Sequence, residues 1–178
     1  ISVLQHQFDV ALFRDITVFP YLSVYLSLVK AFRHVGIRIA NTELTETFIY
    51  NKLHQMMECH RANISIPRTT YISSETVLEN IEKEYEFPVV IKPIHGSHGV
   101  DVARCDTMHA LHEHAQKADW GTYIVQNYLH ACSDYRVMVI NGRALGAVEK
   151  IPAKNDFRTN TDAGAEFKSC TITNTMKN

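Results

Sequence analysis

Apolar residues recur along the chain with a helical period in some stretches and an alternating period in others, so the sequence predicts both helices and strands. Helical spacing covers residues 21–34, where Gly36 follows as a stop, and residues 41–61. Two further helices are expected, one ending at Glu84 and one over residues 107–117. Helices are therefore expected from the N-terminal part of the chain to its middle.

The starts of three of these helices are predicted from side chains that accept hydrogen bonds from free backbone amides. The expected caps are Thr42 or Thr45 for the helix over residues 41–61, Ser73 or Ser74 for the next, and Asp106 for the last. In the helix over residues 41–61, the side chains expected to face the core are Phe48, Leu53, Met56 and Met57, with Lys52 on or near the boundary of that face.

Alternating or continuous apolar runs between the helices predict strands. The runs are "FDVALFRD", "SIPRTTYIS", "VVIK", "VDVARC" and "TYIVQNYL". A hairpin is expected in "DYRVMVINGRALGAVEKI", because Asn141-Gly142 suits a type I′ turn, and the polar segment after Pro152 is expected to be loop. Short antiparallel strands mixed with helices indicate an α+β fold, or mixed α/β layers, and argue against a doubly wound parallel sheet.

Composition narrows the classes of partner. The chain has 178 residues, of which 46% are apolar, which is enough for a real core in one domain or one and a half. Eighteen basic residues against nineteen acidic ones give a net charge of −1, so no charge imbalance favours nucleic acid or an anionic membrane. The early apolar run "ITVFPYLSVYLSLV" is shorter and more polar than the ~20 apolar residues of a membrane span.

The cysteines indicate the compartment. Cys59, Cys105, Cys132 and Cys170 lie far apart and match neither a zinc-ligand spacing nor a compact disulfide framework. We therefore expect reduced thiols in a cytoplasmic protein, with two disulfides in an oxidising compartment as the alternative. The chain starts at Ile1 with no visible signal peptide, and we expect it to be a fragment of a longer protein.

The segment "FPVVIKPIHGSHGVDV" is the first candidate for chemistry. Lys92 ends an apolar strand, and such a lysine either extends its ammonium group to solvent or supplies positive charge to a phosphate. Gly96 and Gly99 allow positive φ and a close backbone approach, and Ser97 adds a hydroxyl donor, so the loop is suited to an anion. A tight turn between two strands is the alternative for this loop taken alone.

Five segments in order resemble the RimK-like α-L-glutamate ligase family of the ATP-grasp superfamily. They are "NKLHQMMECHRANISIPRT", "FPVVIKPIHGSHGVDV", "YIVQNYL", "DYRVMVINGRALGAVEK" and "DFRTN". The resemblance implies a truncated ATP-grasp fold preceded by part of an N-terminal α/β domain. It divides the chain into a remnant of the N-terminal domain (residues 1–40), a lid subdomain with the glycine loop (41–126) and the start of the core subdomain (127–178).

The resemblance also implies roles for particular residues. Two lysines would reach the nucleotide phosphates, the glycine loop would cover the β and γ phosphates, and a hinge would read the adenine edge through its backbone. Arg158 and Asn160, the implied catalytic residues, would face the transferred phosphoryl group and the carboxylate substrate. The residues implied to bind ATP are Lys52, Lys92, Gly96, Ser97, His98, Gly99, Gln126, Asn127, Tyr128, Leu129 and Asp134.

The sequence departs from the family pattern at four positions. His95 stands where the family usually has glutamate, His98 where it has glutamine, Asp101 where it has glycine, and Asn127 where it has glutamate. The magnesium ligands of the family, an aspartate and a Glu-x-Asn pair, have no counterpart before Asn178. We therefore expect ATP and Mg²⁺ as cofactors but no metal ligand within this chain.

The function that the resemblance implies is ATP-dependent ligation of a carboxylate to an amine through an acyl phosphate, with glutamate or a similar amino acid added to a peptide or small carboxylate. The implied partners are ATP and these substrates, and the oligomeric state, a homo-oligomer included, stays open. One alternative is a nucleotide-binding fragment or degenerate homologue without catalysis, and another is a D-alanine–D-alanine ligase-like or glutathione-synthetase-like enzyme. A third is a purely structural or interaction fragment with unpaired strand edges.

Two further polar features of the sequence are the histidines of one predicted helix and Glu149. His109 and His112 share a helix face, which we interpret as solvated, since a zinc site needs further ligands. Glu149 matches an acidic family position, so substrate binding and a cross-strand salt bridge are the two alternatives for it.

Overall fold

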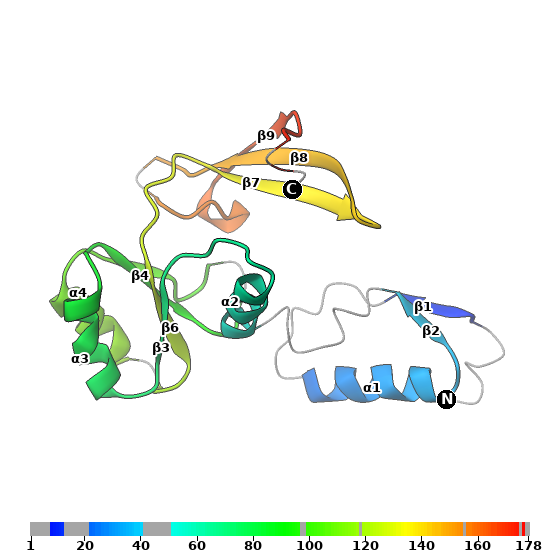
Figure 1. Ribbon diagram of the computed structural model, residues 1–178, viewed down its shortest axis with the longest axis horizontal. Coiled ribbons are helices and arrows are strands. Elements are labelled where there is room, and N and C mark those ends of the chain that lie inside the picture. The colour runs from blue at the N-terminus through cyan, green and yellow to red at the C-terminus, as the bar shows by residue number, and fades with distance from the viewer. Residues whose placement is uncertain are drawn as a thin grey trace. The chain divides into compact units, whose positions relative to one another are not determined.

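The computed structural model describes residues 8–12, 22–40, 51–96, 99–117, 119–154, 156–174 and 176. The chain divides into two compact units, one formed by Ile1–Ser97 and Asp101–Tyr128, the other by His98–Val100 and Leu129–Asn178. No helix within the described ranges is both long enough and apolar enough to span a membrane. Each unit is described on its own below (Figure 1).

The first described segment is a small β-α-β arrangement. Strand β1 (Val10–Leu12) pairs in parallel with β2 (Arg38–Ala40), and helix α1 (Leu22–His34) lies between them in the sequence. The helix ends before Gly36, whose φ of +80° is readily adopted only without a side chain. The sequence predicted β1 and α1 but not β2, which is too short to show a period.

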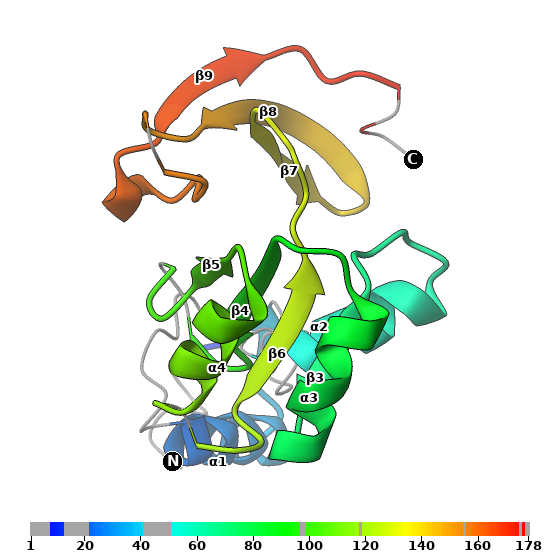
Figure 2. The ribbon, with the colours of Figure 1, turned by 90° about the vertical axis from the view of Figure 1, so that its left-hand side faces the viewer.

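The first unit also contains an antiparallel sheet with the strand order β3-β6-β4-β5. Its strands are β3 (Thr69–Ile72), β4 (Val89–Pro93), β5 (Ala103–Cys105) and β6 (Tyr123–Asn127), and its helices are α2 (Lys52–Arg61), α3 (Glu75–Glu84) and α4 (Met108–Ala115). Figure 1 shows α3 and α4 against one face of this sheet and α2 on the opposite side, and Figure 2 shows α3 and α4 in front of it.

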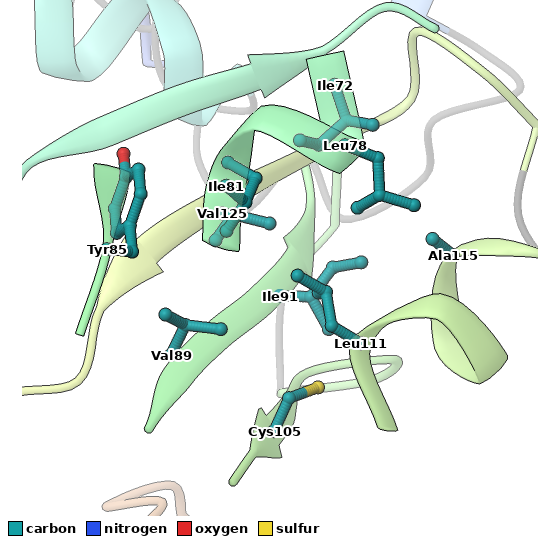
Figure 3. Close-up of a cluster of buried hydrophobic side chains, with 10 residues drawn as sticks. All are labelled: Ile72, Leu78, Ile81, Tyr85, Val89, Ile91, Cys105, Leu111, Ala115 and Val125. Carbon is teal, nitrogen blue, oxygen red and sulfur yellow. The ribbon is translucent and has the colours of Figure 1, made fainter. Parts of the chain in front are cut away.

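The face that α3 and α4 cover forms the core of this unit. Side chains alternate along β4, so Val89 and Ile91 both turn to the helices, where neither has any exposed surface. Figure 3 shows them in one cluster with apolar side chains from both helices. The cluster consists of Ile72, Leu78, Ile81, Tyr85, Val89, Ile91, Cys105, Leu111, Ala115 and Val125.

A side chain caps the start of both α3 and α4. Ser74 caps α3 by accepting a hydrogen bond from the Val77 amide, as the sequence predicted for one of two serines. Thr107 caps α4, so the prediction of Asp106 is wrong; the Asp106 carboxylate instead accepts from Arg104. This helix ends at Ala115 rather than at residue 117.

Helix α2 differs most from its prediction. It begins at Lys52 with Asn51 as its cap, and the Asn51 side chain accepts from the His54 amide at 3.0 Å. The predicted caps Thr42 and Thr45, and the predicted core residue Phe48, lie outside the described residues. The prediction that Met57 faces the core is wrong, because its side chain is 61% exposed.

The second unit contains an antiparallel sheet with the order β7-β8-β9. Strands β7 (Asp134–Ile140) and β8 (Arg143–Ile151) form the predicted hairpin, with φ of +50° at Asn141 and +71° at Gly142. Their register shifts between Met138 and Val139. Strand β9 (Glu166–Cys170) overturns the prediction that everything after Pro152 is loop; most of its side chains are exposed, so no apolar pattern marks it.

Candidate functional site

Two lysines approach the same end of β4 in the first unit. Lys92 lies on β4 with its side chain on the face opposite to Val89 and Ile91, away from α3 and α4. Lys52 is the first residue of α2, and its amide donates to the Ile94 carbonyl at 2.9 Å. A β-bridge between Asn51 and His95 ties the start of α2 to the same segment.

Both lysines carry charge that is poorly solvated. Burial, together with the charge of Lys92, lowers the pKa of Lys52 to about 8, and burial lowers the pKa of Lys92. Within the described ranges, no carboxylate forms an ion pair with either ammonium group. An anion bound between them would therefore relieve both the repulsion and the incomplete solvation.

The glycine loop begins beside these lysines. The Lys52 Nζ donates to the Gly96 carbonyl at 2.9 Å, and Gly96 has a φ of +126° that excludes larger residues. Ser97 and His98 lie outside the described residues. The loop connects two antiparallel neighbours, since Ile91 pairs with Ala103, so it is a connection between adjacent strands as well as a candidate phosphate loop.

The predicted adenine hinge follows β6. Gln126 is only 4% exposed, and its Nε2 donates to the Thr69 hydroxyl at 2.6 Å, so this side chain fixes the sheet rather than facing an open site. The amide of Asn127 donates to the Arg68 carbonyl at 3.2 Å, and that of Tyr128 to the Pro88 carbonyl at 3.4 Å. Leu129 begins the longer segment of the second unit, Leu129–Asn178.

In the second unit, Asp134 is held by two partners. The Lys150 Nζ lies 2.9 Å from each of its carboxylate oxygens, and the Thr159 hydroxyl donates to one of them. Lys150 is 9% exposed and was not among the residues that the sequence singled out. A lysine between Glu149 and Ile151 near the end of a mainly apolar strand was the signal for it, because buried lysines are rare without a partner.

Arg158 and Asn160 lie together near Gly99, which belongs to the same unit. Arg158 forms an ion pair with Asp156 at 2.8 Å, and its Nη1 lies 3.4 Å from the Gly99 carbonyl. The Arg158 guanidinium lowers the pKa of Asp156 to about 2. Gly99 has a φ of +73°, and a Cβ built there would overlap the Asn160 side-chain amide. Arg158 is thus held by a carboxylate while one of its nitrogens points to the glycine segment.

The remaining candidates have simpler roles. The Glu149 carboxylate accepts from the Ser133 hydroxyl at 2.6 Å and the Tyr135 hydroxyl at 3.2 Å, and no salt bridge of it is found in the described part of the chain. His109 is exposed and lies 3.7 Å from the Glu113 carboxylate. All four cysteines are free thiols, and burial is the main cause that raises the pKa of Cys105 to about 11, so it is not a nucleophile at neutral pH.

Comparison with known proteins adds the family. A family model, the prokaryotic glutathione synthetase ATP-grasp domain, matches residues 54–178. The alpha-aminoadipate–LysW ligase LysX of Saccharolobus solfataricus is 29% identical over 139 residues, which are 74% of this chain and 50% of that protein. A probable alpha-L-glutamate ligase of Rhodopirellula baltica is 25% identical over 154 residues, which are 84% of this chain and 38% of that protein. The chain thus spans half or less of the length of these relatives.

Solved structures agree in fold. The D-cycloserine synthetase DcsG matches 97% of this chain and 63% of its own with a TM-score of 0.71 at 15% identity. A RimK domain ATP-grasp protein from Sphaerobacter thermophilus matches 82% of this chain and 68% of its own, with a TM-score of 0.61 at 18% identity. At these identities the likeness concerns the fold alone.

The sheet with its paired lysines and glycine loop, together with these matches, defines an ATP-grasp fold. The chain belongs to the ATP-grasp superfamily and, within it, to the RimK-like family. The resemblance drawn from five segments and the mixed α/β fold class are therefore confirmed. The division at residues 40 and 126 and the roles of the individual site residues stay predictions.

Proposed function

We propose that the protein is an ATP-dependent carboxylate–amine ligase, or the part of one that binds the nucleotide. The observation that supports this most is the pair of partly buried lysines, Lys52 and Lys92, beside Gly96. Neither ammonium group has a carboxylate partner within the described ranges, so together they form a site for a strongly charged anion. The nucleoside triphosphate ATP is the anion that the family uses.

The chemistry proceeds in two transfers. A carboxylate oxygen of the substrate attacks the γ phosphorus of ATP, the bond to the bridging oxygen breaks, and ADP leaves while an acyl phosphate forms. An amine then attacks the acyl carbon, phosphate leaves, and the amine loses a proton. Positive groups stabilise the charge that accumulates on the phosphoryl oxygens, a role we assign to Lys52, Lys92 and Arg158, with Asn160 donating to the transferred group.

The other predicted residues would hold the nucleotide. Residues 96–99 would cover the β and γ phosphates and keep water away from the acyl phosphate. The backbone of residues 126–129 would read the adenine edge, and Asp134, already paired with Lys150, would lie near the nucleotide and orient that lysine. Each of these roles is a proposal from the family pattern.

The substrates are proposed from the relatives. Two of them are named as ligases of alpha-aminoadipate and of glutamate, so we propose an acidic amino acid, glutamate or a close analogue, as one substrate and a peptide or small carboxylate as the other. The free thiols support a cytoplasmic location.

A second candidate is nucleotide binding without ligation. The described residues contain no group of three or more His, Cys, Asp or Glu side chains that could hold a metal ion. Magnesium would enter with ATP and neutralise the phosphate charge. A chain that binds the nucleotide but transfers no phosphoryl group would fit this second candidate.

Calorimetric titration with ATP and Mg²⁺ tests the proposal. We expect the wild-type chain to bind and Lys92→Ala to lose at least about tenfold in affinity, equivalent to ~1.4 kcal/mol. Lys83→Ala, which removes an exposed lysine of α3, is the matched control and should bind as the wild type does. Equal affinity of the wild type and Lys92→Ala would refute the site, and phosphate release with glutamate present would separate ligation from binding alone.

A further inference from the structure

Arg104 lies on the same face of the sheet as Lys92, and the proposed function gives it no role. Cross-strand neighbours share a face of a sheet, and Val90 pairs with Gln126 on one side and Arg104 on the other. Val90 and Lys92 are two residues apart on β4, so their side chains point the same way. Arg104 therefore stands on the side of the sheet opposite to α3 and α4, in the row beside Lys92.

Arg104 contacts the residue with which the first unit ends. Its Cζ lies 4.6 Å from the centroid of the Tyr128 ring, within the range of a cation–π contact. The Asp106 carboxylate accepts from Arg104 Nε at 2.9 Å and from Nη2 at 2.6 Å, which fixes the plane of the guanidinium over the ring. Tyr128 is the residue directly after β6 (Tyr123–Asn127), and its contact with Arg104 places its ring beside the face that carries Lys92.

Two main-chain hydrogen bonds hold the backbone at this point, one of which is from the Asn127 amide to the Arg68 carbonyl at 3.2 Å. The Tyr128 amide donates to the Pro88 carbonyl at 3.4 Å, which is long for such a bond, and the chain then passes into the second unit at Leu129. The Arg104–Tyr128 contact is thus a further restraint on the segment whose backbone is proposed to read adenine.

We propose that Arg104 is a positioning residue of the nucleotide site, which holds the Tyr128 ring and so fixes the backbone of residues 127–129 that receives the adenine base. The inference rests on the proposed function. The proposed nucleotide site then has a phosphate end and a base end. Lys92 and Lys52 attract the phosphates, whereas Arg104 affects only the base, which it does by holding Tyr128. Loss of Arg104 should then weaken binding of the base while leaving binding of the phosphates intact.

The chain offers a matched control. Arg68 lies over the Tyr85 ring at 4.9 Å and forms an ion pair with Glu84 at 2.5 Å. It therefore makes the same two kinds of contact as Arg104, one with an aromatic ring and one with a carboxylate. Tyr85, however, belongs to the core cluster on the face covered by α3 and α4. Arg68→Ala removes a similar side-chain contact from the other side of the sheet and keeps the main-chain carbonyl of residue 68 that accepts from the Asn127 amide.

The test compares ATP with inorganic tripolyphosphate, each with Mg²⁺, by calorimetry on the full chain. Arg104→Ala should lose about threefold or more in ATP affinity and none in tripolyphosphate affinity, whereas Lys92→Ala should lose both. Tyr128→Leu should match Arg104→Ala, and the double variant should be no weaker than either single one. Arg68→Ala should bind both ligands as the wild type does.

The outcomes separate the two proposals. Unchanged ATP affinity in Arg104→Ala would overturn the inference while the proposed function stands. Equal losses for ATP and tripolyphosphate in Arg104→Ala would also overturn it, because they would mean a general structural role. If the wild type bound neither ligand, the inference and the proposed function would both fall.

Discussion

The Lys52 ammonium group donates to the Gly96 carbonyl at 2.9 Å, which links the first residue of α2 to the first glycine of the loop. An ammonium group has three donors, so this bond leaves two of them for phosphate oxygens. Lys52 can therefore hold the loop and bind an anion at the same time. Its role joins the two features that the sequence showed separately, the lysine and the glycines.

The ligand-free protein should become more stable as the pH rises from 8 towards 10.5 because of Lys52. The pKa of Lys52 is about 8 in the folded chain and 10.5, its ordinary value, in the unfolded one, so between these pH values the unfolded state binds more protons than the folded state. Lys52→Met should stabilise the chain at pH 7 and flatten this rise. Denaturant unfolding at several pH values measures it, with Lys83→Met as the control; a rise that persists unchanged in Lys52→Met would contradict the assignment.

Gly99→Ala should destabilise the second unit more than Gly142→Ala does. Both glycines have nearly the same φ, +73° and +71°, so each substitution costs about 1 kcal/mol of backbone strain. A Cβ at Gly142 meets nothing within 4 Å, whereas one at Gly99 overlaps the Asn160 amide. Thermal unfolding of both variants gives the difference, and Asn160→Ala should remove it from the double variant. Equal losses would mean that Gly99 does not lie against Asn160.

Asp134→Ala should cost about 3 kcal/mol in the free energy of unfolding, because it leaves the buried Lys150 ammonium group without its carboxylate. Asp134→Ala combined with Lys150→Met should recover most of that loss, since the apolar side chain needs no partner. Chemical denaturation of the two variants checks this. A double variant as unstable as Asp134→Ala would show that Asp134 acts mainly through Thr159 instead.

Leu78→Ala should lose about 2–5 kcal/mol of unfolding free energy, because Leu78 has no exposed surface and its removal leaves a cavity between α3 and the sheet. Met57→Ala, on the exposed side of α2, should change stability by less than about 0.5 kcal/mol. The comparison, by denaturant unfolding, tests the core in Figure 3 directly. Similar losses in the two variants would place Met57 in a core after all.

The sequence was informative where local chemistry decides the structure. The Asn141-Gly142 turn, the Ser74 cap and the strand that contains Lys92 each follow from residues next to one another in the chain. The choice between Thr107 and Asp106 could not be predicted, since both side chains accept hydrogen bonds and only Arg104, which binds Asp106, decides it. Predicting the cap of α4 therefore required the position of the Arg104 side chain in the folded protein.

Tertiary contacts decided the remaining cases. Strand β9 forms through main-chain pairing with β8 and shows no apolar period, so a search for periodicity passes over it. The partners of Lys150 lie at Asp134 and Thr159, and no spacing rule connects them. For the site, the lysines and glycines were predictable as residue types, but the bond from Lys52 to Gly96 depends on how α2 meets β4.

The register shift between β7 and β8 bears on how this chain behaves at high concentration. Strand β7 lies at the edge of its sheet, and Met138, Val139 and Ile140 near its end are exposed. A flat apolar edge would be a template on which further molecules add strand by strand. Met138 pairs with Gly146 and Val139 with Ala144, so Leu145 of β8 is an extra residue that increases the local twist of the hairpin. A twisted edge pairs less readily with another strand than a flat one, so the hairpin can expose apolar side chains with less risk of fibre formation.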